Sequence, residues 1–225
     1  MPSDLRLCDI CAEIYPRNDP TWGNDKIRVF SYQEDGCLII AAAGSRVAVD
    51  TELDRLDTLH DWWRDLAAIK QIVVPRFGSV SDSFWEDADS VFDSIFAEVT
   101  RLGLPVWLTA HSKGGPEVQA IAARMTEKGV VPAGLTTFES PAIGYLAWRL
   151  GVITAGRDYA HLGDFIVSAP PEVNHPRAIT WFPDPPLSLF PDPFANHHLA
   201  TAVRPALVRY LAANPDIQAG LLEIR

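Results

Sequence analysis

The stretch from Val106 to Gln119 reads VWLTAHSKGGPEVQ and places a short apolar run directly before a glycine-rich turn and a helical pattern. The run Val106–Thr109 is typical of a buried strand, and Pro116–Lys128 has the spacing of a helix. Between them, small residues stand at both ends of the pentapeptide AHSKG, whose centre is Ser112. A strand, a tight turn and a helix in this order form a nucleophile elbow, which holds its serine in a strained, exposed position. The pattern therefore predicts an activated serine, and the alternative is a Ser/Gly loop that caps a helix.

Short apolar runs alternate with longer helical patterns on both sides of this segment. The expected strands are Ile27–Tyr32, Cys37–Ala43, Ile72–Pro75, Val106–Thr109, Leu135–Phe138 and Ala178–Phe182. The expected helices are Thr58–Ile69, Ser83–Leu102, Pro116–Lys128, Ile143–Leu150 and Leu199–Ala212. Strands separated by long helices imply right-handed crossovers, so we expect an α/β fold with a mostly parallel central sheet and helices on both faces. Gln33–Gly36 is short enough to make the first two strands an antiparallel hairpin.

The composition limits the classes of protein to which the chain can belong. With 225 residues, 48% of them hydrophobic, one domain over residues 1–225 is the default. A formal net charge of −10 disfavours binding to nucleic acid or to an anionic membrane, because both attract basic surfaces. We therefore expect a small substrate of little charge, without a cofactor or a metal ion.

The sequence shows neither a Sec signal peptide nor the run of about 18 apolar residues that a membrane span requires. The three cysteines, Cys8, Cys11 and Cys37, lie near one end and are odd in number, which argues against a disulfide framework. Cys8 and Cys11 fall on one apolar face of a helical pattern, so we expect them to be buried. These features together favour a cytoplasmic protein.

A nucleophilic serine needs a base and an acid that orients the base, because a free hydroxyl is a weak nucleophile at neutral pH. In α/β-hydrolases these residues follow the serine in the order Asp or Glu, then His. Asp164 comes at the end of the short run Tyr159–Gly163, where the carboxyl edge of a sheet is expected. Asp184 and Asp192 are alternative acids in the Pro-rich loop Pro183–Pro193. The downstream histidines are His161, His175, His197 and His198.

His111 precedes the predicted nucleophile directly and should point away from it, since neighbouring residues of an extended chain alternate in direction. We therefore expect it to pack or to form a hydrogen bond at the elbow.

Further segments accompany the elbow in a fixed order. LIIAAAGS (Leu38–Ser45), DWWRDL (Asp61–Leu66), AHSKGG (Ala110–Gly115), TFESPAIG (Thr137–Gly144) and HHL (His197–Leu199) follow one another. In this order they resemble the class 3, or fungal-type, triacylglycerol lipases, a family with the α/β-hydrolase fold. The resemblance extends from about Cys37 to His198.

The resemblance implies a serine hydrolase that acts on carboxylic esters, with an ester or a lipid as its substrate. Asp164 stands before the pair Pro170-Pro171, as the catalytic aspartate of the family stands before a Pro-Pro pair. The site residues that it implies are Ser112 as nucleophile, Asp164 as acid, His197 as base with His198 in reserve, and the backbone N–H groups of Ser45 and Lys113 as the oxyanion hole.

Three residues depart from the family pattern: Ala110 and Glu139 stand where the family has glycine, and Lys113 where it has an apolar residue. The sequence also lacks a long helix between Pro75 and Phe84, where lipases of this family commonly have a lid. The missing lid favours soluble or short-chain esters. Thioesterases, amidases and acyltransferases can use the same triad, and a non-catalytic hydrolase-like binding protein is a further alternative.

Overall fold

The computed structural model describes the N-terminal part of the chain, its central part and most of its C-terminal part. The described residues are 1–44, 70–144, 150, 153, 155–162, 164, 166–167, 175–182 and 199–219. The predicted helix Thr58–Ile69 and the Pro-rich loop Pro183–Pro193 lie outside these residues.

In the described chain, seven strands form one sheet in the order β1-β2-β3-β6-β7-β8-β9. From β3 onward neighbouring strands are parallel, whereas β1, β2 and β3 pair antiparallel. The predicted α/β class with a mostly parallel sheet is therefore confirmed. The strands are β1 (Trp22–Gly23), β2 (Arg28–Glu34), β3 (Cys37–Ala42), β6 (Val106–His111), β7 (Gly134–Phe138), β8 (Asp158–His161) and β9 (Ile179–Phe182).

The connection from β2 to β3 is the predicted antiparallel hairpin. Asp35 and Gly36 form its turn, with φ angles of 50° and 71°. Two successive residues with positive φ give the turn a twist that matches the twist of paired strands, and Asp-Gly is a preferred sequence for it.

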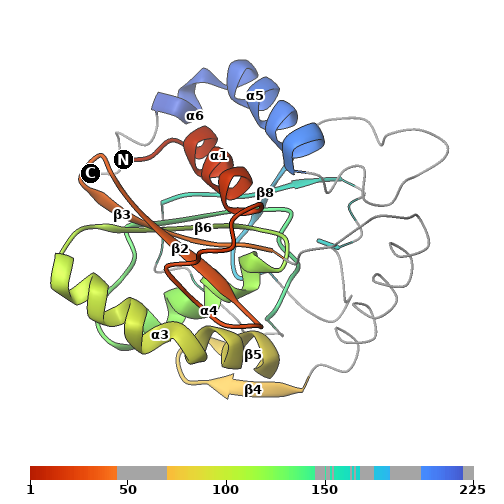
Figure 1. Cartoon of the computed structure of the whole chain (residues 1–225). Helices are drawn as coiled ribbons and strands as arrows, with labels where there is room; N and C mark the ends of the chain where they lie inside the picture. The colour runs from red at the N-terminus through yellow and green to blue at the C-terminus, as the bar shows by residue number, and fades with distance from the viewer. Residues whose placement is uncertain are drawn as a thin grey trace.

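Helices cover both faces of the sheet (Figure 1). One face carries α1 (Asp4–Ile14) and α5 (Arg204–Ala213), and the other carries α3 (Asp82–Leu102) and α4 (Gly114–Glu127). A π-helical turn, η2 (Leu199–Val203), leads into α5, and α6 (Pro215–Ala219) follows it.

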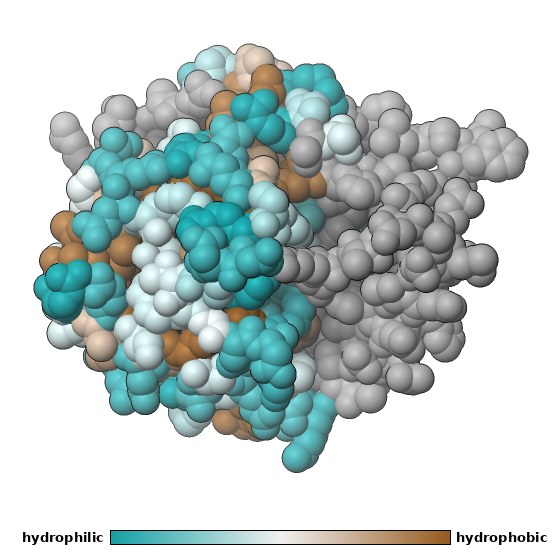
Figure 2. Space-filling view, in the orientation of Figure 1, coloured by the Kyte–Doolittle hydropathy of each residue, from teal (hydrophilic) through white to brown (hydrophobic). Residues whose placement is uncertain are grey.

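β3 shows why a strand of this sheet has a continuous apolar sequence. Leu38, Ile40 and Ala42 belong to the core under α3 and α4, whereas the alternate residues Ile39 and Ala41 belong to the core under α1 and α5. Because successive side chains point to opposite faces, a strand covered on both sides must be apolar at every position. On the face shown in Figure 2, most of the described surface is hydrophilic, with small hydrophobic areas between.

Two predicted elements differ in the structure. The strand expected at Ile72–Pro75 is β4 (Gln71–Val74), but it pairs antiparallel with β5 (Gly78–Ser81) in a separate two-stranded sheet. The predicted helix Ile143–Leu150 does not begin at Ile143: Gly144 forms a bridge with Val80, and the Ile143 carbonyl accepts a hydrogen bond from the Ser81 N–H (3.1 Å). Pairing with the hairpin thus satisfies backbone groups that the local sequence pattern assigned to a helix.

Candidate active site

Ser112 lies on the turn between β6 and α4, with a φ of 55°. Its N–H donates to the Phe138 carbonyl at the end of β7 (3.0 Å), and its carbonyl accepts from the Gly115 N–H (2.8 Å). A left-handed conformation at a residue other than glycine costs on the order of 1–3 kcal/mol and persists only where its surroundings enforce it. These two bonds enforce it here, so the local conformation is that of a nucleophile elbow.

The small residues at the ends of the elbow have a steric cause. A Cβ atom on Gly114 would lie 2.5 Å from the Ala42 carbonyl oxygen and 3.2 Å from the Cβ of Ala110. The start of α4 is therefore pressed against β3 and against the residue two places before Ser112. Ala110 fits this space, which explains why the exchange of the family's glycine for alanine is tolerated.

Gly44 brings the end of β3 next to the elbow. A Cβ atom there would lie 3.1 Å from the Cβ of Ser112 and 2.9 Å from the His111 carbonyl oxygen. Ser45, the predicted oxyanion-hole residue, lies outside the described residues. Gly44, the residue directly before it, lies close to Ser112.

Tyr15, at the end of α1, joins these two segments. Its hydroxyl lies 2.5 Å from Nδ1 of His111, and the backbone of Gly44 bonds to the same hydroxyl. Burial raises the pKa of Tyr15 well above its ordinary value, so the hydroxyl stays neutral and keeps its proton. The hydrogen bond predicted for His111 is confirmed. The role of Tyr15 was missed, because in the sequence it is one more apolar position on a helix.

Lys113 has its ammonium group in an ion cluster. Nζ lies 2.8 Å from the Lys26 carbonyl oxygen, 3.2 Å from Asp87 Oδ2 and 3.1 Å from Glu117 Oε1. Asp87 on α3 thus balances its charge, and the carboxyl of Glu117 on α4 gives the ammonium group a further oxygen contact. Its backbone N–H stands at the head of α4, where the first N–H groups of a helix have no acceptor within the helix.

Asp164 follows β8 and is fully buried. One of its carboxylate oxygens, Oδ1, accepts a hydrogen bond from the Ile166 N–H (2.9 Å), and its own N–H donates to the His161 carbonyl (3.2 Å). A carboxylate that accepts a backbone N–H is stabilised in its charged form.

Glu139 follows β7 and is a second fully buried carboxyl in the same region. Oε1 lies 2.7 Å from Nδ1 of His161, and both carboxyl oxygens accept from the His161 N–H (3.0 and 3.2 Å). Burial raises the pKa of Glu139 well above its ordinary value, and the charge of Asp164 raises it further. The sequence marked Glu139 as a departure from the family pattern but indicated no partner for it.

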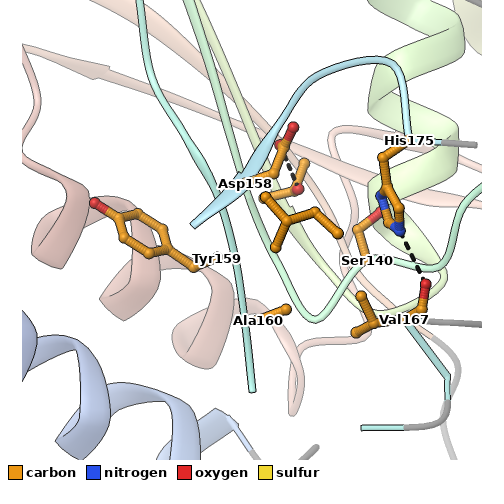
Figure 3. Close-up of a pocket in the computed structure, with 8 residues that line it drawn as sticks. Ser140, Asp158, Tyr159, Ala160, Val167 and His175 are labelled. Atoms are coloured by element: carbon orange, nitrogen blue, oxygen red, sulfur yellow. Dashed lines mark hydrogen bonds between the residues drawn. The ribbon is translucent and has the colours of Figure 1, made fainter. Parts of the chain in front are cut away.

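His175, which precedes β9, lines a small pocket together with residues of β7, β8 and β9, among them Thr137, Asp158 and Ile179 (Figure 3). Its Nε2 is 2.9 Å from the Val167 carbonyl oxygen, and burial lowers its pKa. Tyr159 points away from His175, toward the side of the sheet that α1 and α5 cover.

Of the predicted site residues, Ser112 and Lys113 follow the carboxyl end of β6, and Asp164 follows that of β8. Glu139, which the sequence did not assign to the site, follows β7, the strand between them in the sheet. His197 and His198 lie outside the described residues, as Ser45 does. Leu199, which directly follows His198, is buried in the core that α1 covers.

The described residues offer no group of three or more His, Cys, Asp or Glu side chains that could hold a metal ion. Within the same residues, each helix is too short or too polar to cross a bilayer. Cys8, Cys11 and Cys37 are free and buried, as their positions in the sequence predict for the first two.

No family model matches the sequence, and no curated protein matches it by sequence. Solved structures do match the fold. Rhizomucor miehei triacylglyceride lipase has 18% identity and a TM-score of 0.58, over 74% of this chain and 66% of its own. The Lip2 lipase from Yarrowia lipolytica has 12% identity and a TM-score of 0.58, over 88% of this chain and 81% of its own.

A third similar structure is a triacylglycerol lipase whose catalytic centre is formed by a serine protease triad. It has 15% identity and a TM-score of 0.52, over 71% of this chain and 68% of its own. This chain therefore spans about two thirds of the length of two of these three lipases. The architecture expected from the sequence motifs is confirmed: the chain has the α/β-hydrolase fold of the fungal triacylglycerol lipases.

Proposed function

We propose that the protein is a serine hydrolase that cleaves carboxylic esters through an acyl-enzyme on Ser112. The observation that carries the proposal is the left-handed conformation of Ser112 on the turn between β6 and α4. A turn of this kind lifts the serine hydroxyl above the carboxyl edge of the sheet, where strand-terminal loops supply its partners. The fold shared with three lipases supports the same function.

The proposed mechanism uses one base, one acid and two backbone donors. His197, oriented by Asp164, removes the Ser112 proton as the serine oxygen attacks the acyl carbonyl. The backbone N–H groups of Ser45 and Lys113 stabilise the oxyanion, and the alcohol leaves with a proton from His197. Water, activated by the same histidine, then attacks the acyl-enzyme and releases the acid.

The other downstream histidines have partners elsewhere, which supports the choice of His197. His161 is bonded to the Glu139 carboxyl and His175 to the Val167 carbonyl. His197 is the proposed base, with His198 as the alternative. A His197→Ala variant should lose activity, whereas His198→Ala should retain it.

We propose soluble or short-chain esters as the preferred substrates. The chain between Pro75 and Phe84 forms the turn and second strand of the β4–β5 hairpin and then enters α3. It therefore contains no separate lid helix, the element that shields the site in lipases acting at lipid surfaces. Lipids with longer acyl chains remain within the proposed class.

The test is covalent labelling with a fluorophosphonate probe, read by intact mass, together with hydrolysis of p-nitrophenyl esters from acetate to palmitate. Wild type should take up one probe per chain and hydrolyse the short esters fastest. Ser112→Ala should lose the label and at least about 10⁴-fold in kcat.

Added acceptor alcohols distinguish hydrolysis from acyl transfer, because a transferase would form the new ester in preference to the free acid. A folded wild-type protein that neither takes up the probe nor cleaves any ester would contradict the proposal and favour a binding protein with a hydrolase fold.

A further inference from the structure

The carboxyl edge of the sheet holds two buried carboxyl groups in contact. Glu139 and Asp164 are both fully buried and both bond to His161, Glu139 through its carboxyl (2.7 Å to Nδ1) and Asp164 through its N–H (3.2 Å to the carbonyl), and a side-chain hydrogen bond to Asp164 is among the causes that raise the pKa of Glu139. Two carboxylates without a proton cannot form such a bond, because neither has a donor. One of the two must therefore keep its proton.

The surroundings assign this proton to Glu139. The Ile166 N–H donates to Asp164 Oδ1 and favours the charged form of Asp164. For Glu139, burial raises the pKa most, and the charge of Asp164 raises it further. Its Oε1 contacts the His161 ring, so Oε2 remains to share its proton with Asp164.

The backbone of Glu139 gives an independent indication. Its φ is 46°, in the region where glycine is favoured and other residues are strained. The family pattern that this segment resembles has glycine at the position. A glutamate here carries a conformational cost that glycine would avoid, which points to a use for its carboxyl.

We propose that Glu139 is a positioning residue for the catalytic acid: anchored by His161, its carboxyl donates a hydrogen bond to Asp164 and fixes the orientation in which Asp164 meets the catalytic base. The inference rests on the proposed function, since it assigns Asp164 to the triad.

The arrangement makes activity depend on the protonation of Glu139. Among the described residues, the titratable groups that face its carboxyl are Asp164 and His161. While Glu139 is neutral, the pair carries one negative charge and Asp164 is held in place. Once Glu139 ionises, two adjacent carboxylates repel each other and the hydrogen bond is lost.

The experiment compares Glu139→Gln and Glu139→Ala with wild type. The measurements are the rate constant of fluorophosphonate labelling from pH 6 to 10, and kcat and KM for p-nitrophenyl butyrate. For wild type, the labelling rate constant should decline at alkaline pH, as Glu139 ionises. The Glu139→Gln variant keeps a neutral donor at every pH, so its rate constant should stay within about threefold of wild type at pH 7 and should not show this decline. Alanine removes the donor and should lower kcat about tenfold or more at pH 7, with KM changed less than twofold.

Asp158→Asn is the matched control. Asp158 is a buried carboxyl at the opposite end of β8, bonded to Thr137 and Arg177, so its replacement should leave the pH profile of labelling unchanged. Circular dichroism and thermal unfolding establish that each variant is folded, and the isosteric glutamine variant decides the question if the alanine variant does not fold.

An alkaline decline in Glu139→Gln that matches wild type would overturn the inference, whatever the alanine variant does. Failure of the proposed function has a different signature: wild type itself would show no labelling that Ser112→Ala abolishes. An active wild type, an inactive Ser112→Ala and an unaltered Glu139→Gln profile would refute the role of Glu139 alone.

Discussion

At the residue scale, the hydroxyl of Tyr15 connects two segments of the chain that meet at the elbow. The hydroxyl contacts Nδ1 of His111, the residue before the nucleophile, and the backbone of Gly44, the residue before Ser45. It therefore connects the two segments that carry the proposed oxyanion-hole donors. Oxyanion stabilisation depends on donors held in place before the reaction.

Tyr15→Phe should lower kcat roughly tenfold with little change in KM, because the two donors lose their common anchor. The free energy of unfolding should fall by about 1 kcal/mol, the net contribution of a typical hydrogen bond. Steady-state kinetics and urea unfolding measure the two effects.

Tyr32→Phe is the control, since the Tyr32 hydroxyl accepts a long bond from Arg17 (3.4 Å) away from the elbow. Equal kcat values for Tyr15→Phe and wild type would show that the hydroxyl does not position the site.

At the scale of elements, α4 carries a buried acid whose protonation affects stability. Glu117 is fully buried in the core, and burial raises its pKa from 4.5 to about 8. Below pH 4.5 the acid is protonated in both the folded and the unfolded state. Between pH 4.5 and 8 the unfolded chain releases this proton while the folded chain retains it, so stability falls as the pH rises.

We expect the free energy of unfolding of wild type to decrease, relative to Glu117→Gln, by on the order of 3 kcal/mol between pH 4.5 and 8. Glutamine has no proton to release in this range. Urea unfolding at a series of pH values gives the difference.

Glu98→Gln serves as a comparison on α3, because the pKa of Glu98 is lowered by its bond to Arg101. The difference in stability between Glu98→Gln and wild type should be constant above about pH 4.5 and should change only below it, as Glu98 of wild type becomes protonated and its bond to Arg101 is lost. A pH-independent difference between wild type and Glu117→Gln would contradict the raised pKa of Glu117.

At the scale of the whole molecule, Asp4 ties the first helix to the centre of the sheet. Its buried carboxylate accepts from Thr136 Oγ1 (3.2 Å), from the Arg157 guanidinium (3.2 Å) and from the Tyr159 hydroxyl (2.6 Å). These partners belong to β7, β8 and the residue before β8. The network therefore holds α1, and with it Tyr15, in register with strands distant in sequence.

Asp4→Ala should lower the free energy of unfolding by about 2–3 kcal/mol, because it leaves buried donors without an acceptor. Asp9→Ala on the same helix, which removes a surface pair with Arg204 of α5, should have little effect. Chemical denaturation of both variants tests the comparison, and similar midpoints for the two would show that the network contributes no more than a surface pair.

The sequence by itself determined the elements whose pattern is local. Alternating apolar runs and helices predicted the mostly parallel sheet, Asp35-Gly36 the hairpin turn, and AHSKGG the elbow with Ser112 at its centre, because each depends on side-chain period or on turn stereochemistry over a few residues.

Contacts between distant segments were decided by the tertiary structure alone. The bond from Tyr15 to His111 spans 96 residues, and that from Glu139 to His161 spans 22, so no local pattern could indicate either. The predicted strand Ile72–Pro75 is likewise present as β4, but it pairs with β5 in a separate sheet, since strand order depends on which edges are free to pair and not on the propensity of one segment. In the sequence, Glu139 only stands where the family pattern has glycine. The folded chain brings its carboxyl next to Asp164, and this contact gives the carboxyl its proposed chemical role.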